Sequence, residues 1–166
     1  VVAFTGTNGK TTCSLLYAQL LAKAKFLGEQ QKSSFIGTTG YGVAEPQCSN
    51  TSDQLFKAKR SGDIQLTTPD AVSVQRIMAE LAMNGTQSVA LEASSHSLVQ
   101  CRLESIEIDI AVFTNLSRDH LDYHPDLESY AAAKARLFEL PSVQTAIINL
   151  DDAVGEEIAA NLPSAM

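Results

Sequence analysis

Hydrophobic and polar positions follow one another along the chain in blocks that predict strands alternating with helices. The predicted strands are short apolar runs at residues 1–4, 35–37, 88–91, 106–113 and 145–149. The predicted helices are residues 14–21, 127–140 and 153–160, together with one that begins near residue 68. This alternation predicts a three-layer α/β fold, in which a mostly parallel sheet carries helices on both faces.

The helix near residue 68 has recognisable signals at both ends. Thr68 is expected to be its N-cap, Pro69 its first helical residue and Asp70 part of its first turn. Asn84-Gly85 marks its end, because glycine readily adopts the conformation that terminates a helix. Before this helix, residues 44–66 are polar, and we interpret them as a long loop or an irregular hairpin.

The first strand leads into a glycine-containing turn followed by a helix. Unpaired backbone N–H groups at such a turn, together with the helix dipole, favour a bound anion. Lys10 is expected to reach the β- and γ-phosphates of a nucleotide, and Thr11 to offer a hydroxyl to Mg²⁺. Phe4 stands where the common phosphate-loop motif has glycine, so this is a shorter variant of a P-loop NTPase-like site. The predicted nucleotide-binding residues are Gly6, Thr7, Asn8, Gly9, Lys10, Thr11 and Thr12.

Ionisable residues follow two further predicted strands. Glu92 ends a buried strand, where its carboxylate either holds Mg²⁺ or faces solvent. Residues 114–124 include His120 and His124, which share a face if the segment is helical; zinc or a solvated charged loop are both conceivable there. Lys134 is either a surface lysine or a residue that approaches the site. Because ligands bind beyond the carboxyl ends of parallel strands, one shared site is predicted.

The composition is that of one globular domain and excludes several classes of protein. Among 166 residues, 45% are apolar and 19% are charged. The net charge of −7 argues against a nucleic-acid partner, which needs a basic face. No apolar run approaches the ~20 residues of a membrane span, and the three cysteines form no C-x-x-C pair. We therefore expect a cytoplasmic protein with reduced thiols and no membrane association.

Taken together, the motifs resemble those of the Mur ligase family of bacterial cell-wall synthesis. The similarity is greatest to members that add the third amino acid to UDP-N-acetylmuramoyl-L-alanyl-D-glutamate, and it covers nearly the whole chain. The matching segments are 6–12, 67–69, 92–96, 100–102, 114–124 and Lys134 in its Tyr-x-x-x-Lys setting. Folylpolyglutamate synthetases share the loop but are less similar around Ser94-Ser95-His96 and residues 119–122.

The resemblance implies an ATP-dependent amide ligase that phosphorylates a carboxylate and passes the acyl group to an amine. It implies one Mg²⁺ site at Thr11 and Glu92. It implies a second at His120, organised by Lys134 after carbamylation by CO₂, and it places Asn115 near the adenine. The implied catalytic residues are Lys10, His120 and Lys134. The implied contacts to the UDP-muramoyl-peptide are Thr67, Thr68, Ser94, Gln100 and Arg102.

Residues 1–166 are interpreted as the central ATPase domain of a longer protein, because both ends of the sequence look cut. The resemblance implies an N-terminal uridine-binding domain and a C-terminal domain that selects the amino acid. Without them the fragment is expected to be inactive, and a monomer is expected. A small-molecule kinase stays open as an alternative. A GTPase is disfavoured because the chain has no N-K-x-D pattern, and a non-catalytic interaction domain is disfavoured by the converging ionisable residues.

Overall fold

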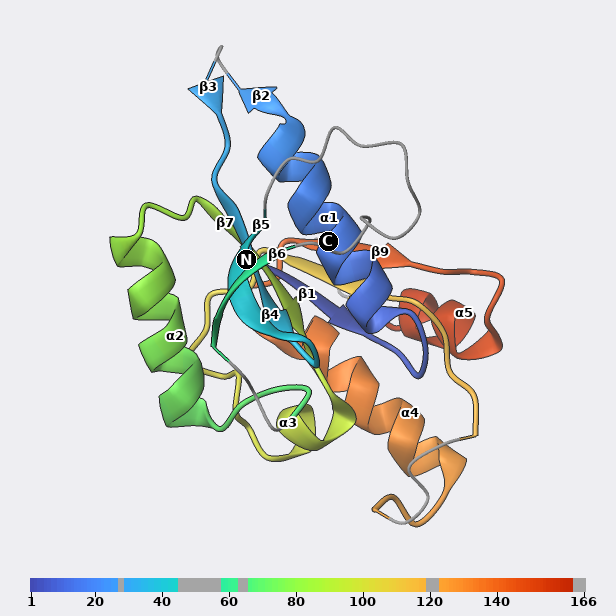
Figure 1. Ribbon diagram of the computed structural model, residues 1–166. Helices are drawn as coiled ribbons and strands as arrows, with labels where there is room; N and C mark the ends of the chain where they lie inside the picture. Colours follow the sequence, from blue (N-terminus) through green and yellow to red (C-terminus); the bar gives the residue numbers. More distant parts are fainter. Residues whose placement is uncertain (27–28, 45–57, 63–65, 119–122, 163–166) are drawn as a thin grey trace.

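The computed structural model describes residues 1–26, 29–44, 58–62, 66–118 and 123–162. Within these residues, seven strands form one sheet with the order β6-β5-β4-β7-β1-β8-β9 (Figure 1). Its strands are β1 (Val2–Thr5), β4 (Ser33–Gly37), β5 (Gly40–Ala44), β6 (Ala58–Gly62), β7 (Ser88–Glu92), β8 (Ile110–Phe113) and β9 (Thr145–Ile148). A two-stranded ribbon of β2 (Lys25–Phe26) and β3 (Glu29–Gln30) lies apart from this sheet.

Five neighbouring strands of the sheet are parallel. These are β4, β7, β1, β8 and β9, whereas β5 pairs antiparallel with β4 and β6 pairs antiparallel with β5. Every residue of β1 is buried, as expected for a strand with neighbours on both sides and helices on both faces. Phe4 pairs with Glu92, and Thr5 pairs with Phe113. The carboxyl ends of β7, β1 and β8 therefore meet at one edge of the sheet.

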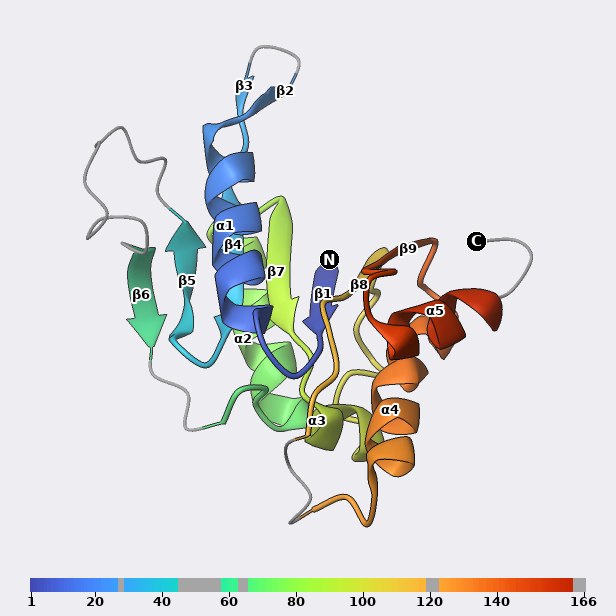
Figure 2. The same cartoon turned by 90° about the vertical axis from the view of Figure 1, so that its right-hand side faces the viewer.

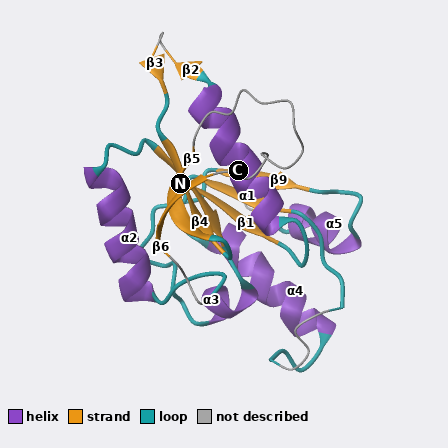
Figure 3. Ribbon diagram, viewed as in Figure 1, coloured by secondary structure: helices purple, strands orange, loops and turns teal. Residues whose placement is uncertain are grey.

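Helices cover both faces of the sheet (Figures 2 and 3). They are α1 (Lys10–Lys23), α2 (Ala71–Met83), α3 (Ser95–Val99), α4 (Leu127–Ala135) with the 3₁₀ turn η2 (Arg136–Glu139), and α5 (Ala153–Ala160). On one face, Leu15 and Ala18 of α1 pack with Phe4 of the sheet. On the other face, the buried residues of α2, α3, η2 and α5 share a core with Leu91 and Ala111. The predicted three-layer α/β fold is confirmed.

The predicted start of the second long helix is wrong. Asp70, not Thr68, is the N-cap of α2, since its carboxylate accepts hydrogen bonds from the backbone N–H groups of Val72 and Ser73. The Thr68 hydroxyl instead donates to the carbonyl oxygen of Glu92 at 2.6 Å, and the side chain is 1% exposed. Both residues can cap a helix, and the tertiary bond to β7 decides between them. Pro69 consequently lies before the helix.

Two other elements are shorter than predicted. The strand expected at 106–113 contains only Ile110–Phe113, and the helix expected at 127–140 changes to a 3₁₀ turn after Ala135. Of the two interpretations of 44–66, the hairpin matches the described residues, because β6 pairs with β5 with a shift of register beside Tyr41.

None of the helices that the structure describes is long and apolar enough to cross a membrane.

Candidate active site

The turn between β1 and α1 has the backbone geometry of a phosphate-binding loop. Gly6 has φ 142° and Gly9 has φ 87°, both conformations that residues with a side chain rarely adopt. A Cβ atom at Gly6 would lie 2.0 Å from Thr114 Oγ1, so only glycine fits there. Within the part of the chain that the structure describes, no side chain caps the N-terminus of α1. The first-turn N–H groups and the helix dipole are therefore suited to an anionic ligand.

The segment after β8 holds this loop from one side. Backbone N–H groups of Thr7 and Asn8 donate to the backbone oxygen and the Oδ1 of Asn115, at 2.8 and 3.0 Å. The Asn115 side-chain amide donates in turn to Asn8 O at 3.0 Å, and Thr114 Oγ1 donates to the same oxygen at 2.7 Å. Ser117 N donates to Thr7 Oγ1 at 2.9 Å. Asn115 thus fixes the shape of the loop, and a contact with adenine stays a prediction.

Two lysines converge on the loop. Lys10 Nζ donates to the carbonyl oxygens of Gly6 and Thr7 at 2.9 and 3.0 Å. Lys134 Nζ donates to the same Gly6 oxygen at 2.8 Å, and its side chain is completely buried with the ammonium over the Tyr130 ring. The interpretation of Lys134 as a surface lysine is therefore wrong. Two ammonium groups at one edge of the sheet attract a polyanionic ligand.

Glu92 is enclosed rather than facing solvent, which excludes the second interpretation of this residue. It is 1% exposed, and its Oε2 accepts a hydrogen bond from Thr11 Oγ1 at 2.9 Å. Thr38 donates twice, from its N–H to Oε1 at 3.0 Å and from its hydroxyl to Oε2 at 3.2 Å. Burial raises the pKa of Glu92 above its usual range, although the hydrogen bonds from Thr11 and Thr38 and the charge of Lys10 oppose this shift.

The oxygens around Glu92 are the ligand types that Mg²⁺ prefers. A carboxylate and a threonine hydroxyl from two different elements meet here, beside the phosphate loop. Mg²⁺ is usually held by one or two carboxylates together with substrate phosphates, so such a pair suffices. Among the described residues, His, Cys, Asp and Glu side chains form no cluster of three that could hold a metal alone. His120, the predicted ligand of a second metal, lies outside the described residues.

A network of hydroxyl and guanidinium groups continues from β7 to α3. Thr68 Oγ1 lies 3.2 Å from Ser94 Oγ and accepts a hydrogen bond from Ser94 N at 3.0 Å. Arg102 Nη1 donates to the backbone oxygen of Thr68 at 2.8 Å, while its Nε donates to Gln100 Oε1 at 2.9 Å. The Gln100 amide reaches the hydroxyl of Tyr123 at 3.3 Å. Four of the five residues predicted to contact the peptide substrate are therefore joined by hydrogen bonds, and with the adjacent Thr67 they form one wall.

This wall and Lys10, which directly follows the phosphate loop, line a single hollow. Its volume is about 280 Å³, and its lining includes Lys10, Lys134, Thr67, Thr68, Ser94 and Arg102. Thus predicted nucleotide and substrate residues from four separate segments of the chain come together. Gln100 does not line the hollow but holds Arg102, and Thr12 lies exposed in the first turn of α1.

His124 packs between Ser95 of α3 and Tyr130 of α4, next to the site. It is 4% exposed, its Nε2 lies 2.9 Å from Ser95 Oγ, and its ring packs on Tyr130 with centroids 5.0 Å apart. The hydroxyl of Tyr130 shares a hydrogen bond of 3.3 Å with Thr7 Oγ1. His124 therefore connects α3, α4 and the phosphate loop through packed side chains. The zinc interpretation also involves His120, which lies outside the described residues, so it stays a prediction.

Comparison with known proteins agrees with this geometry. Residues 4–165 match the family described as the Mur ligase middle domain. That match covers nearly the whole chain, including the loop, the wall and Lys134. The chain belongs to the Mur ligase middle-domain family.

Two relatives of this middle domain carry the same name. The chain is 46% identical over 162 residues to the UDP-N-acetylmuramoyl-L-alanyl-D-glutamate–2,6-diaminopimelate ligase of Nitrosomonas europaea, covering 98% of this chain and 27% of that protein. It is 42% identical over 161 residues to the ligase of the same name from Coxiella burnetii, covering 97% and 29%. The chain thus spans less than a third of the length of these relatives.

Solved structures confirm the fold of the middle domain. A structure of UDP-N-acetylmuramoyl-L-alanyl-D-glutamate–2,6-diaminopimelate ligase matches with a TM-score of 0.75 and 42% identity, covering 99% of this chain and 30% of that one. Escherichia coli FolC in complex with DHPP and ADP matches with a TM-score of 0.55 and 20% identity, covering 97% and 40%. The FolC likeness concerns the fold alone.

Two residues of the middle domain's site were missed by sequence reasoning. Thr38 follows the carboxyl end of β4, the edge at which the other site residues were found. Gly37 lets Glu92 pack against the backbone, because a Cβ there would lie 2.0 Å from Glu92 Oε1. The strand-end rule that selected Glu92 applies equally to β4 and would have found both.

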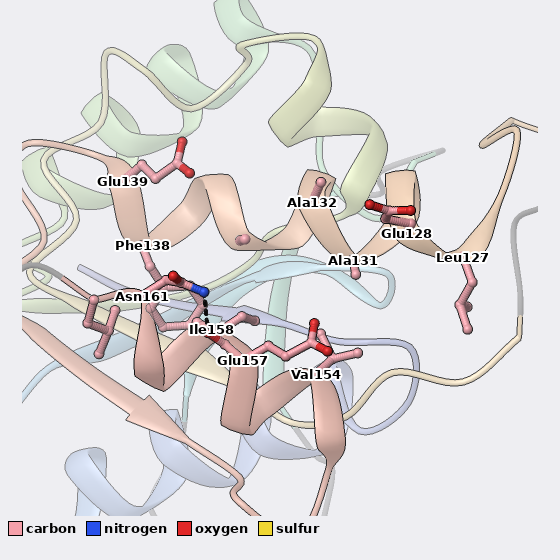
Figure 4. A pocket seen from close by; sticks show the side chains of 12 residues that line it. Leu127, Glu128, Ala131, Ala132, Phe138, Glu139, Val154, Glu157, Ile158 and Asn161 are labelled. Atoms are coloured by element: carbon pink, nitrogen blue, oxygen red, sulfur yellow. Dashed lines mark hydrogen bonds between the residues drawn. The ribbon is translucent and has the colours of Figure 1, made fainter.

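A larger hollow of the middle domain lies away from this site. Between α4 and α5, about 470 Å³ is enclosed mainly by apolar side chains, with Glu128 and Glu157 at its margin (Figure 4). None of the predicted site residues lines it. It therefore takes no part in the phosphate site.

Proposed function

We propose that this chain is the central, nucleotide-binding domain of an ATP-dependent amide ligase. Its proposed reaction adds meso-diaminopimelate to UDP-N-acetylmuramoyl-L-alanyl-D-glutamate, the reaction in the names of its relatives. The observation that carries the proposal is the hollow in which the phosphate-loop lysine meets Thr67, Thr68, Ser94 and Arg102. Because the chain covers 27% to 29% of two such relatives, we place the uridine-binding and amino-acid-binding domains elsewhere in the complete protein.

The proposed reaction proceeds in two steps. A carboxylate oxygen of the D-glutamyl residue attacks the γ-phosphorus of ATP, the bond to the β–γ bridging oxygen breaks, and ADP leaves. The amine nitrogen then attacks the carbonyl carbon of the acyl phosphate, inorganic phosphate leaves, and the nitrogen loses a proton. The first step brings two anions together, so its rate depends on positive charge placed between them.

The loop and Glu92 are suited to that first step. The N-terminus of α1 and Lys10 hold the triphosphate and offset its charge, and Asn115 keeps the loop in shape. Thr11 and Glu92 would hold Mg²⁺. When bound, Mg²⁺ neutralises charge on the phosphate oxygens. Arg102, fixed by Thr68 O and Gln100, directs its guanidinium toward an anionic group of the peptide substrate.

Lys134 is proposed to be carbamylated in the working enzyme, with His120 as its partner at a second metal. The amine nitrogen would bond to the carbon of CO₂ and lose a proton, giving an anionic carbamate. In its unmodified form Lys134 donates to Gly6 O at 2.8 Å, and its ammonium must first lose a proton to free the nitrogen lone pair that bonds to CO₂. Labelled bicarbonate tests it: a carbamate carbon signal should appear in the complete protein and be missing in Lys134→Ala. A signal retained in that variant would contradict the assignment.

The remaining parts of the proposal concern partners and location. The ligands would be ATP, Mg²⁺, the UDP-linked dipeptide and one amino acid, and neither nucleic acid nor membrane is proposed as a partner. We propose a monomer in the cytoplasm, where UDP-linked precursors and ATP are both present.

The deciding assay measures ADP release by the complete protein. We expect release that requires both the UDP-linked dipeptide and diaminopimelate, together with formation of the tripeptide product. Release with the dipeptide but without any product of an amine would favour a kinase, and release with a folate substrate would favour the folylpolyglutamate synthetase alternative. The isolated chain of residues 1–166 should form no product.

A further inference from the structure

Thr38 lies at the candidate site but has no role in the proposed reaction. It follows β4, which lies beside β7 in the sheet, and Ile36 pairs with Leu91 one residue before the strands end. The next residues of the two strands, Gly37 and Glu92, are therefore neighbours. Because Gly37 has no side chain, the Glu92 carboxylate lies directly against the backbone that leads into Thr38.

Thr38 holds both oxygens of the Glu92 carboxylate. Its backbone N–H donates to Oε1 at 3.0 Å, and its hydroxyl donates to Oε2 at 3.2 Å. Thr11 Oγ1 approaches the same Oε2 at 2.9 Å. Two threonines from different elements thus meet at one oxygen, and the N–H of Thr38 donates to the other. The carboxylate has little freedom to rotate while Thr38 keeps these bonds.

The same hydroxyl reaches the wall proposed to bind the peptide substrate. Thr38 Oγ1 lies 3.2 Å from Thr67 Oγ1. A hydroxyl has one hydrogen, which Thr38 Oγ1 can donate either to Glu92 Oε2 or to Thr67 Oγ1, and the charged carboxylate is the stronger acceptor. A chain of contacts therefore runs from Thr11 through Glu92 and Thr38 to Thr67.

We propose that Thr38 is a positioning residue, which fixes the Glu92 carboxylate for a divalent cation and connects it to Thr67. The inference rests on the proposed function only in assigning Glu92 to Mg²⁺. Partners that orient a metal-binding carboxylate typically change metal affinity by about 10- to 100-fold when they are removed. The hydroxyl of Thr38 is such a partner.

Three substitutions in the complete protein test this role. Thr38→Val removes the hydroxyl at constant shape, and Thr38→Ser keeps it. Thr39→Val is the matched control, because Thr39 Oγ1 is buried without a hydrogen-bond partner in the described part of the structure. Mg²⁺ is titrated calorimetrically into each protein saturated with ADP, and ADP is titrated separately in the presence of EDTA.

We expect Thr38→Val to weaken Mg²⁺ binding by about 10-fold or more, with ADP affinity in EDTA unchanged. Thr38→Ser should restore Mg²⁺ affinity, and Thr39→Val should match the parent. Equal Mg²⁺ affinity in Thr38→Val and the parent would overturn the inference, as would an equal loss in Thr39→Val. If Thr38→Val does not fold, Thr38→Ala replaces it with the same expectation.

The readout separates this inference from the proposed function. It needs neither the peptide substrate nor turnover, so a protein that fails to ligate can still show the effect of Thr38. If the parent itself shows no Mg²⁺ binding with ADP, the assignment of Glu92 is wrong and the inference is overturned with it.

Discussion

The two sides of α4 have opposite chemistry. One side carries Tyr130 and Lys134, both completely buried against the phosphate loop. The other carries Leu127 and Ala131 toward α5, beside the hollow of about 470 Å³ (Figure 4). The hollow at the phosphate loop is smaller, about 280 Å³, yet it gathers hydroxyls, a guanidinium and two lysines. Convergent polar side chains, and not the size of a hollow, are the reason for assigning the candidate site to the phosphate loop.

The largest effect should come from the loop side of this comparison. Lys10→Ala removes the ammonium at Gly6 O and Thr7 O, and we expect ligation to fall by about 100-fold or more, because charge stabilisation at transferred phosphate is lost. Steady-state assays of ADP release measure it. Lys23→Ala, at the opposite end of α1, is the control and should retain full activity. Equal activity in Lys10→Ala and the parent would contradict the role of the loop in phosphate transfer.

A smaller effect should follow from filling the space beneath Glu92. In Gly37→Ala the new Cβ would lie 2.0 Å from Glu92 Oε1, and such overpacking typically costs about 1–3 kcal/mol of stability. Denaturant unfolding measures this cost, and Mg²⁺ binding should weaken at the same time. Gly85→Ala is the control, because its Cβ meets nothing within 4 Å and only the φ of 78° is strained. A loss of Mg²⁺ affinity in Gly85→Ala as well would show that the weaker Mg²⁺ binding of Gly37→Ala does not arise from the contact with Glu92.

The pH dependence of stability tests the burial of Glu92 beside the phosphate loop. Burial raises the pKa of folded Glu92 above its unfolded value, so the folded state holds the proton more tightly. Stability is therefore highest below the unfolded pKa and falls as the pH rises through the folded pKa. Glutamine does not ionise, so Glu92→Gln should melt at a higher temperature than the parent at neutral pH in EDTA. The difference should narrow as the pH falls.

Melting curves at several pH values provide this test. Glu156→Gln, an exposed position on α5, serves as the matched control and should follow the parent at every pH. A Glu92→Gln protein that is less stable than the parent at neutral pH would contradict the desolvation of Glu92.

The smallest effect should come from the far side of α4. Ala131→Leu extends into the hollow beside α5, and we expect ligation to stay at the parent level with a stability change within about 1 kcal/mol. Ala133→Leu is the matched substitution on the buried side, where the residue is 3% exposed, and should cost about 1–3 kcal/mol. Activity assays and denaturant unfolding compare them. Loss of ligation in Ala131→Leu alone would make the larger hollow part of the site.

Local signals made the phosphate loop and the sheet predictable. The order of apolar runs and the glycines with Lys10 identify a strand, a turn and a helix within a dozen residues. The burial of Lys134 was not predictable, because an alanine-rich helix offers small side chains on every face. Tertiary packing against the loop decides which face is buried.

Contacts between distant segments account for most of what the sequence did not reveal. The bond between Thr38 and Glu92 joins residues 54 positions apart, and no local pattern specifies it. Asp70 is the N-cap in place of the predicted Thr68 for a similar reason, because the Thr68 hydroxyl donates to the backbone carbonyl of Glu92 in β7. Register between the parallel strands β4 and β7 determines the contact of Thr38 with Glu92, and neither strand alone specifies that register.

The most direct test of the central claim follows one oxygen atom. The complete protein is supplied with ATP, Mg²⁺, diaminopimelate and a UDP-linked dipeptide whose D-glutamyl carboxylate carries oxygen-18, and the released phosphate is analysed by mass spectrometry. Attack of that carboxylate on the γ-phosphorus predicts transfer of a labelled oxygen to inorganic phosphate. Product formation with unlabelled phosphate would contradict the acyl-phosphate reaction proposed for this site.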